Sequence, residues 1–409
     1  MKVERVAPNT LHWGSSLIFL LCGAKRAGWG QLAPPMRKLA LCMLLGALSF
    51  TARADGLPKV FPHLTRIRYD GQCLTIDDRD VFIFSASFPY FDCPKALWRE
   101  RFRKIKEEGC NAVATPVPGN SRDLADLKDW LHMAQDEFGL YTIIGPGAPA
   151  TWPVIAAEQV TRKLRGRPGV ILVQIEDDAL AHYRAAVAGG IDVPIFTSGM
   201  RQCRDSDDPS LSQVFDTVSL DPRSDLDSSA QKIAELESDQ ADAPAMVTVL
   251  PAAGQPAIKP GQLDAQMLLA IESGATIIDC QTNPVPAAIG RMLREHGAAL
   301  TRSRPIACQV ETASPDATVT ARLTRDNAIY LFFRNRSLTA RQRGVAVIWL
   351  EKSGEIEVNY DLEPFGFDVL YMAPGVRWPF DSGRSVPAPR ALDGGLQRVP
   401  AGAEWLPKR

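Results

Sequence analysis

Acidic and amide side chains gather at the end of one apolar run. Residues 170–175 are apolar and mostly β-branched except for Gln174, which is typical of a buried parallel strand. Glu176, Asp177 and Asp178 follow at once. A carboxyl group can give or take a proton, so these residues are candidates for acid–base chemistry. They also stand where α/β barrels carry their active sites, although a solvated loop would hold acidic residues too.

The elements that would position this cluster form a repeating pattern. Short apolar runs typical of strands alternate with helical segments over about 220 residues, which predicts a (β/α)8 TIM barrel. The predicted strands are 81–85, 111–115, 141–144, 170–175, 193–197, 214–220, 245–250 and 275–279. A doubly wound open sheet is the alternative, but no glycine-rich phosphate loop follows the first strand. Asp221 and Asp279 end two of these strands and add carboxylates to the predicted barrel mouth.

The pattern changes after Arg304. Four segments there have the partial two-residue alternation of antiparallel strands, separated by turn residues. We therefore expect the α/β barrel domain, residues 55–304, to be followed by a small antiparallel, sandwich-like β domain at 305–380. Residues 381–409 are rich in proline and glycine and are predicted to be a tail.

The first 54 residues predict export. Met36, Arg37 and Lys38 precede the apolar run 39–50, and Ala52-Arg53-Ala54 has the form of a cleavage site. We expect a signal peptide at 36–54, an upstream segment before it, and a mature protein in the periplasm or outside the cell. The apolar run is short for a spanning helix, so we expect no stable membrane span after cleavage; an N-terminal anchor is the alternative.

Composition narrows the classes of partner. A net charge of −1 argues against nucleic acid, which needs a basic surface. The five histidines are scattered without metal-ligand spacing, and the cysteines form no pair spaced for zinc. We therefore expect neither a metal nor a cofactor. Removal of the leader would leave six of the eight cysteines, and an oxidising compartment would allow some of these to pair.

Residues 66–290 resemble the glycoside hydrolases of family 35, the exported or lysosomal β-galactosidases. The likeness is strongest over 82–102 and 104–113, and continues through 127–152 and the strand at 170–178. The resemblance implies a (β/α)8 barrel followed by β domains, and a β-galactoside-type glycan as partner. It also implies retaining hydrolysis by two carboxyl groups about 5–5.5 Å apart, one a proton donor and one a nucleophile.

The catalytic positions of that family are altered here. Asp178 matches the acid/base glutamate and is one methylene shorter. Val249 matches the nucleophile, and a valine cannot form a glycosyl-enzyme. The resemblance assigns sugar binding to five other residues, Tyr90, Asn120, Trp152, Gln174 and Asp177. Other sugar-binding positions have lost their carboxylates and aromatic rings.

Three hypotheses follow. The first is a carbohydrate-binding homologue that has lost the ancestral hydrolysis. The second is an active glycosidase with a rebuilt pair, Asp178 with Asp221 or Asp279, which for an inverting mechanism would stand about 6.5–9.5 Å apart. The alternative for Asp221 and Asp279 is a structural role as turn or cap residues. The third is an exported interaction protein that binds through its β domain, for which Trp378 and Trp405 are candidates, while Trp349 is expected in the core.

Overall fold

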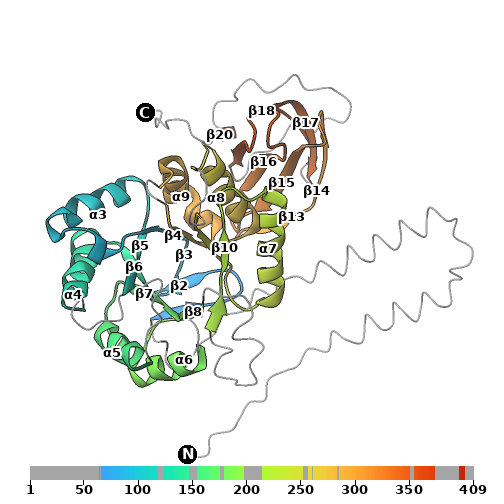
Figure 1. Ribbon diagram of the computed structural model, residues 1–409. Coiled ribbons are helices and arrows are strands. Elements are labelled where there is room, and N and C mark those ends of the chain that lie inside the picture. The colour runs from blue at the N-terminus through green and yellow to red at the C-terminus, as the bar shows by residue number, and fades with distance from the viewer. Residues whose placement is uncertain are drawn as a thin grey trace, which may run out of the picture. The chain divides into compact units, whose positions relative to one another are not determined.

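A computed structural model describes residues 64, 66–117, 124–146, 154–175, 179–197, 214–251, 257–259, 261–282, 285–350, 354–373 and 396–400. All of them lie in one compact unit, residues 56–409 (Figure 1). Among these residues, no helix has the length and apolar character needed to cross a membrane.

The central sheet is a parallel barrel. Its strand order is β10-β11-β12-β4-β5-β6-β7-β8-β9, and β9 and β10 are halves of one strand interrupted at Thr217. Because β9 pairs with β8 and β10 pairs with β11, this strand closes the ring as the sixth of eight. The predicted (β/α)8 barrel is confirmed. The strands are β4 (Ile83–Ser87), β5 (Ala112–Val117), β6 (Tyr141–Pro146), β7 (Val170–Ile175), β8 (Ile195–Thr197), β9 (Val214–Asp216), β10 (Val218–Leu220), β11 (Met246–Val249) and β12 (Ile277–Cys280).

Side chains satisfy the backbone where the sixth strand breaks. The Thr217 hydroxyl donates to the Thr197 carbonyl over 3.0 Å. The Gln240 amide accepts from the Asp216 backbone N–H over 2.9 Å and donates to the Asp216 carbonyl over 3.0 Å. The interruption therefore costs little stability, because these contacts pair the backbone N–H and carbonyl of Asp216.

Helices follow the strands and cover the outside of the barrel (Figure 1). Helix α3 illustrates the cause: Trp98, Phe102 and Ile105 recur at helical spacing and are buried, while charged residues face solvent. At the end of α3 a Cβ added to Gly290 would lie 1.9 Å from the Glu108 carbonyl oxygen, so glycine permits the close approach of α3 and α9. The helices are α3 (Trp98–Glu107), α4 (Leu124–His132), α5 (Val154–Leu164), α6 (Ala179–Ala188), α7 (Leu226–Asp239), α8 (Gln262–Ser273) and α9 (Ala287–Leu300).

Strand register separates inward-facing from outward-facing residues. Side chains paired across neighbouring strands project to the same side, and successive residues alternate. The Thr142 hydroxyl accepts from the Gln135 amide beyond α4, so its side of the sheet faces the helices. Following the pairs around the ring places Val249 and Cys280 on this outer side with Thr142. It places the following residues on the inner side: Ser85, Leu172, Gln174, Phe196, Phe215, Thr248 and Asp279.

A small antiparallel sheet precedes the barrel: β1 (Ile67–Tyr69), β2 (Leu74–Ile76) and β3 (Arg79–Val81). The Tyr69 ring lies 5.3 Å from that of Phe215, and the Thr276 hydroxyl, just before β12, donates to the Gln72 carbonyl. The sheet therefore lies at the amino-terminal end of the barrel strands, which we call the base.

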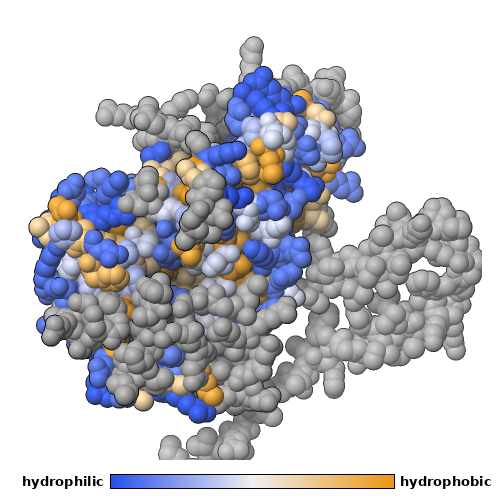
Figure 2. Space-filling view, in the orientation of Figure 1, coloured by the Kyte–Doolittle hydropathy of each residue, from blue (hydrophilic) through white to orange (hydrophobic). Residues whose placement is uncertain are grey.

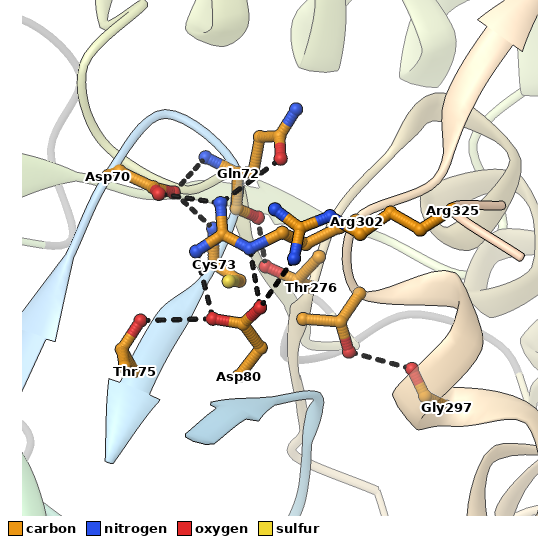
Figure 3. Close-up of polar contacts among 10 residues, drawn as sticks. Asp70, Gln72, Cys73, Thr75, Asp80, Thr276, Gly297, Arg302 and Arg325 are labelled. Carbon is orange, nitrogen blue, oxygen red and sulfur yellow. Dashed lines mark hydrogen bonds and ion pairs between the residues drawn. The ribbon is translucent and has the colours of Figure 1, made fainter. Parts of the chain in front are cut away.

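The base is held by a network of charged side chains around Arg302 (Figure 3). The Arg302 guanidinium donates to both carboxylate oxygens of Asp80, over 2.6 and 2.8 Å, and to Asp70 over 2.6 Å. Arg325, in the turn between two strands of the C-terminal domain, adds a 3.4 Å ion pair to Asp80. The network joins the β1–β3 sheet, the chain after α9 and the C-terminal domain.

The C-terminal domain consists of two antiparallel sheets. One has the order β13-β15-β16-β19-β20 and the other β14-β17-β18. Their facing residues, such as Phe333 and Ile348, share one core, as the strand alternation predicts for a sandwich. Strand β20 lies within the stretch predicted to be a tail. The bounds are β13 (Arg304–Ile306), β14 (Cys308–Thr312), β15 (Ala317–Leu323), β16 (Ile329–Asn335), β17 (Gln342–Leu350), β18 (Gly354–Leu362), β19 (Phe367–Met372) and β20 (Leu396–Pro400).

The other face of the larger sheet packs against the barrel helices. Tyr330, Phe332 and Val369 belong to the same core as the barrel. The Tyr330 hydroxyl lies 2.9 Å from Nδ1 of His296 on α9, and the His296 Nε2 atom is buried without a partner among the described residues. The surface over these elements is mixed, with scattered apolar residues among hydrophilic ones (Figure 2).

Candidate active site

A carboxylate lies inside the barrel, on the eighth strand. Asp279 is 5% exposed and accepts hydrogen bonds from the Ser85 hydroxyl and the Gln281 amide. The two donors hold one oxygen each, which fixes the plane of the carboxyl group. The backbone N–H of Gln281 donates to the Val249 carbonyl, so Gln281 continues the ladder toward the carboxyl end of the strands, which we call the mouth.

The Asp279 carboxyl is buried and is held by neutral hydrogen-bond donors. Burial raises its pKa, and the hydrogen bonds from Ser85 and Gln281 oppose this without cancelling it. No described cation forms an ion pair with it within 4.0 Å. A carboxyl group whose pKa is raised by burial is suited to give up a proton to a bound molecule, as a general acid does.

Gln174 stands on the same inner side of the sheet and is partly exposed. A Cβ on the neighbouring Gly145 would lie 2.8 Å from the Gln174 amide oxygen, so the absence of a side chain at Gly145 leaves room for this amide. The sequence prediction of Gln174 as a sugar-binding residue is compatible with this inward position, because an amide can both donate to and accept from sugar hydroxyls.

The seventh strand presents no carboxylate to the barrel interior. Val249 is completely buried and lies on the helix-facing side, whereas the inward residue beside it is Thr248. Leu250 follows and is 47% exposed. None of these three side chains could form an ester with a sugar at neutral pH in the way that a carboxylate nucleophile does.

Asp221 serves the local turn. Its carboxylate accepts from the Arg223 backbone N–H over 2.9 Å and pairs with the Arg223 guanidinium over 3.0 Å. These contacts have the geometry of an Asx turn, so the carboxylate has a structural role in this turn. Asp221 is half-buried.

Tyr90 is almost completely buried, at 1% exposure. Its ring packs against Trp98 and Trp130, with centroids 6.2 Å away in each case. The Tyr90 ring therefore contributes to the core just after the first barrel strand, β4. Four other predicted site residues, Asn120, Trp152, Asp177 and Asp178, lie outside the described residues.

The sequence analysis did not assign Ser85, Thr248 or Gln281 to the site, and the structure places all three on the inner side of the barrel. The two-residue alternation of strands 81–85 and 275–279, extended to residue 281, could have grouped Ser85, Asp279 and Gln281 on one face.

Among the described residues, no group of three or more His, Cys, Asp or Glu could hold a metal ion. The described cysteines, Cys73, Cys93, Cys110, Cys280 and Cys308, form no disulfide.

Comparison with known proteins links part of this scaffold to glycosidases. Residues 73–160 match the family model "Glycosyl hydrolases family 35". The mouse β-galactosidase is 30% identical over 137 residues, which cover 31% of this chain and 19% of the relative. The human β-galactosidase-1-like protein 2 is 29% identical over 159 residues, 35% of this chain and 24% of the relative. An exo-β-D-glucosaminidase of Pyrococcus horikoshii is 30% identical over 96 residues, 20% of this chain and 12% of the relative.

The matched region thus spans less than a quarter of the length of these relatives. Among solved structures, a family 27 β-L-arabinopyranosidase from Geobacillus stearothermophilus aligns with a TM-score of 0.49 and 9% identity, over 72% of this chain and 98% of that one. The family-model match includes the first three strands of the barrel, β4, β5 and β6, and helices α3 and α4. This part of the chain is therefore similar to the glycosyl hydrolases of family 35.

Proposed function

We propose that the barrel mouth binds a glycan with a terminal β-linked galactose, and that the ancestral retaining hydrolysis has been lost. The observation that carries the proposal is the end of the seventh strand, where the inward residue is Thr248 and the aligned residue Val249 faces the helices. Without a carboxylate there, one half of the retaining pair is missing. Gln174 and Gln281 carry partly exposed amides on the inner side of the barrel, and amides can bind sugar hydroxyls.

The test combines binding and turnover. Titration calorimetry with lactose should give saturable binding that Gln174→Ala weakens about tenfold, the usual effect of losing one or two hydrogen bonds. Gln309→Ala, an exposed glutamine on β14, is the matched control and should change nothing. The protein should release nitrophenol from 4-nitrophenyl β-galactoside no faster than the uncatalysed reaction does. Turnover that Asp178→Ala abolishes would refute the loss of hydrolysis, and equal affinity of Gln174→Ala and wild type would refute the binding site.

One observation favours a second candidate, an inverting glycosidase. Asp279 faces the interior, and burial raises its pKa, which a general acid requires. Asp178 would then act as the base that activates water. In that case the product of an aryl β-glycoside should appear first as the α-anomer in proton NMR spectra, and both Asp279→Asn and Asp178→Asn should reduce turnover by at least a hundredfold. A β-anomer as first product would exclude the inverting pair.

We also propose that the chain is exported, with cleavage after Ala54. The support is the order of basic, apolar and small residues at 36–54. Amino-terminal sequencing of protein recovered from the periplasm or medium should begin at Asp55. Recovery of uncleaved protein in the cytoplasm alone would contradict export.

A further inference from the structure

A hollow lies on the outer wall of the barrel, close to the base. Its volume is about 730 Å³, and residues of α3 and α9 and of the segments that precede β5 and β6 line it. The lining residues that precede strands lie at the opposite end of the sheet from Gln281. The volume is within the range of small-molecule sites, which is about 300–1,000 Å³.

Apolar side chains form the floor of this hollow. Phe82, Phe84, Leu140 and Leu293 line it, and each of them is less than one-tenth exposed. Asn111 carries the one amide side chain of the lining, and it is already used: it accepts from the Phe84 backbone N–H over 2.9 Å and donates to the Phe82 carbonyl over 2.7 Å. The floor therefore suits an apolar group and offers little to sugar hydroxyls.

The rim of the hollow is held in place by contacts between its walls. The Lys106 ammonium on α3 donates to the Phe138 carbonyl. The Arg294 guanidinium on α9 donates to the Lys106 carbonyl over 2.7 Å. Together with the close approach of Gly109 and Gly290, these contacts connect all sides of the hollow. A site that exists before its ligand arrives loses less entropy on binding.

The charges of the rim favour an anion. Arg103, Lys106 and Arg294 are exposed cations at its edge, and Glu107 is an exposed anion. Asp80 also lines the hollow, but its charge is compensated by Arg302 over 2.6 Å. Leaving out this pair, the rim carries 3 − 1 = 2 positive charges.

We propose that this hollow binds a small organic anion with a flat, apolar body and one acidic group, of the class of aryl carboxylates and sulfonates. The aromatic floor would take the body, and Arg103, Lys106 and Arg294 would face the acid. The proposal is independent of the glycan site, because none of the lining residues faces the barrel mouth.

Two matched dyes test the proposal on the full chain. 8-Anilinonaphthalene-1-sulfonate has the proposed chemistry, and N-phenyl-1-naphthylamine has the same body without the charge. Fluorescence titration should show the sulfonate binding about tenfold more tightly than the neutral dye, with an advantage that shrinks as salt is raised. Arg103→Gln should reduce the affinity for the sulfonate about three- to fivefold and leave that for the neutral dye unchanged. Lys104→Gln, the adjacent exposed cation that does not line the hollow, is the control and should leave both unchanged.

A second variant tests the floor without removing a charge. Ala298 is exposed on α9 and lines the hollow, so Ala298→Trp should fill it and abolish the binding of both dyes while the thermal midpoint stays within a few degrees. Saturating lactose should displace neither dye, whether or not the protein binds lactose. Equal effects of Arg103→Gln and Lys104→Gln, or undiminished binding by Ala298→Trp, would overturn the proposal.

Discussion

Carboxylates at the two ends of this barrel are in opposite electrostatic settings. At the base, the Arg302 guanidinium donates to Asp80 and Asp70, and the hydrogen bond from Arg302 lowers the pKa of Asp80. Toward the mouth, Asp279 is held only by neutral donors, and burial raises its pKa. A paired carboxylate contributes to stability, whereas a buried one without a cation costs stability and is retained where its chemistry is used. The contrast agrees with the general division of barrels into a stabilising base and a functional mouth.

Breaking the base should produce the largest effect. Arg302→Met leaves Asp70 and Asp80 without their main cation, and we expect the free energy of unfolding to fall by about 3–5 kcal/mol. Urea unfolding followed by circular dichroism measures this change. Arg325→Met is the matched control: its side chain is 64% exposed and 3.4 Å from Asp80, so the change should stay below about 1 kcal/mol. Similar losses in the two variants would show that Arg302 is not the centre of the network.

The junction of the barrel and the β domain extends the comparison from carboxylates to a histidine. It buries the His296 imidazole, which becomes charged when it takes up a proton. His296 lies between Tyr330 and Tyr371, and burial lowers its pKa, which Glu295 opposes. The unfolded chain then takes up a proton more readily than the folded one, so stability should be lost as pH falls through about 6.5.

His296→Gln keeps a hydrogen-bonding side chain and removes the titration. The loss of stability between pH 7 and pH 5 should therefore be smaller in this variant than in the wild type. Thermal unfolding at each pH measures the difference. Identical pH profiles would mean that His296 takes up its proton as readily in the folded protein as in the unfolded chain.

The smallest effect is expected inside the barrel. Asp279 holds its proton to a higher pH when folded than when unfolded, so its ionisation costs stability as pH rises above about 3.9. Asp279→Asn should leave the free energy of unfolding at pH 7 unchanged or raise it by up to about 1 kcal/mol, and the difference should vanish in acid. A loss of more than about 2 kcal/mol at pH 7 would indicate that the ionised carboxylate has a stabilising partner, and would remove the contrast with Asp80.

Local patterns were sufficient for the barrel and its strands. The run at 170–175 became β7, and the alternation after Arg304 became a two-sheet domain. The pattern could not show that the sixth strand is broken at Thr217, because the cause is a side-chain contact with Thr197 on the neighbouring strand. Trp349 was expected in the core, but it lies on the outer side of β17 and donates to Glu355.

The sequence could not predict which side chains enter the barrel interior, nor the contacts of Arg302. Aligning Val249 with a catalytic residue says nothing of the side of the strand on which it lies, which depends on the register with β10 and β12. The sequence did not predict the Arg302 network, because Asp70 and Asp80 precede Arg302 by more than 200 residues along the chain. No local signal distinguishes these residues from ordinary surface charges.

The same separation has a consequence for the order of synthesis. Asp70 leaves the ribosome early, and its arginine partner follows 232 residues later. Until then the β1–β3 sheet lacks its main cation, and β12, which must pair with β4 to close the ring, has only just been made. The barrel therefore cannot be completed on a growing chain until nearly three hundred residues have emerged, and contacts of such high order make closure slow.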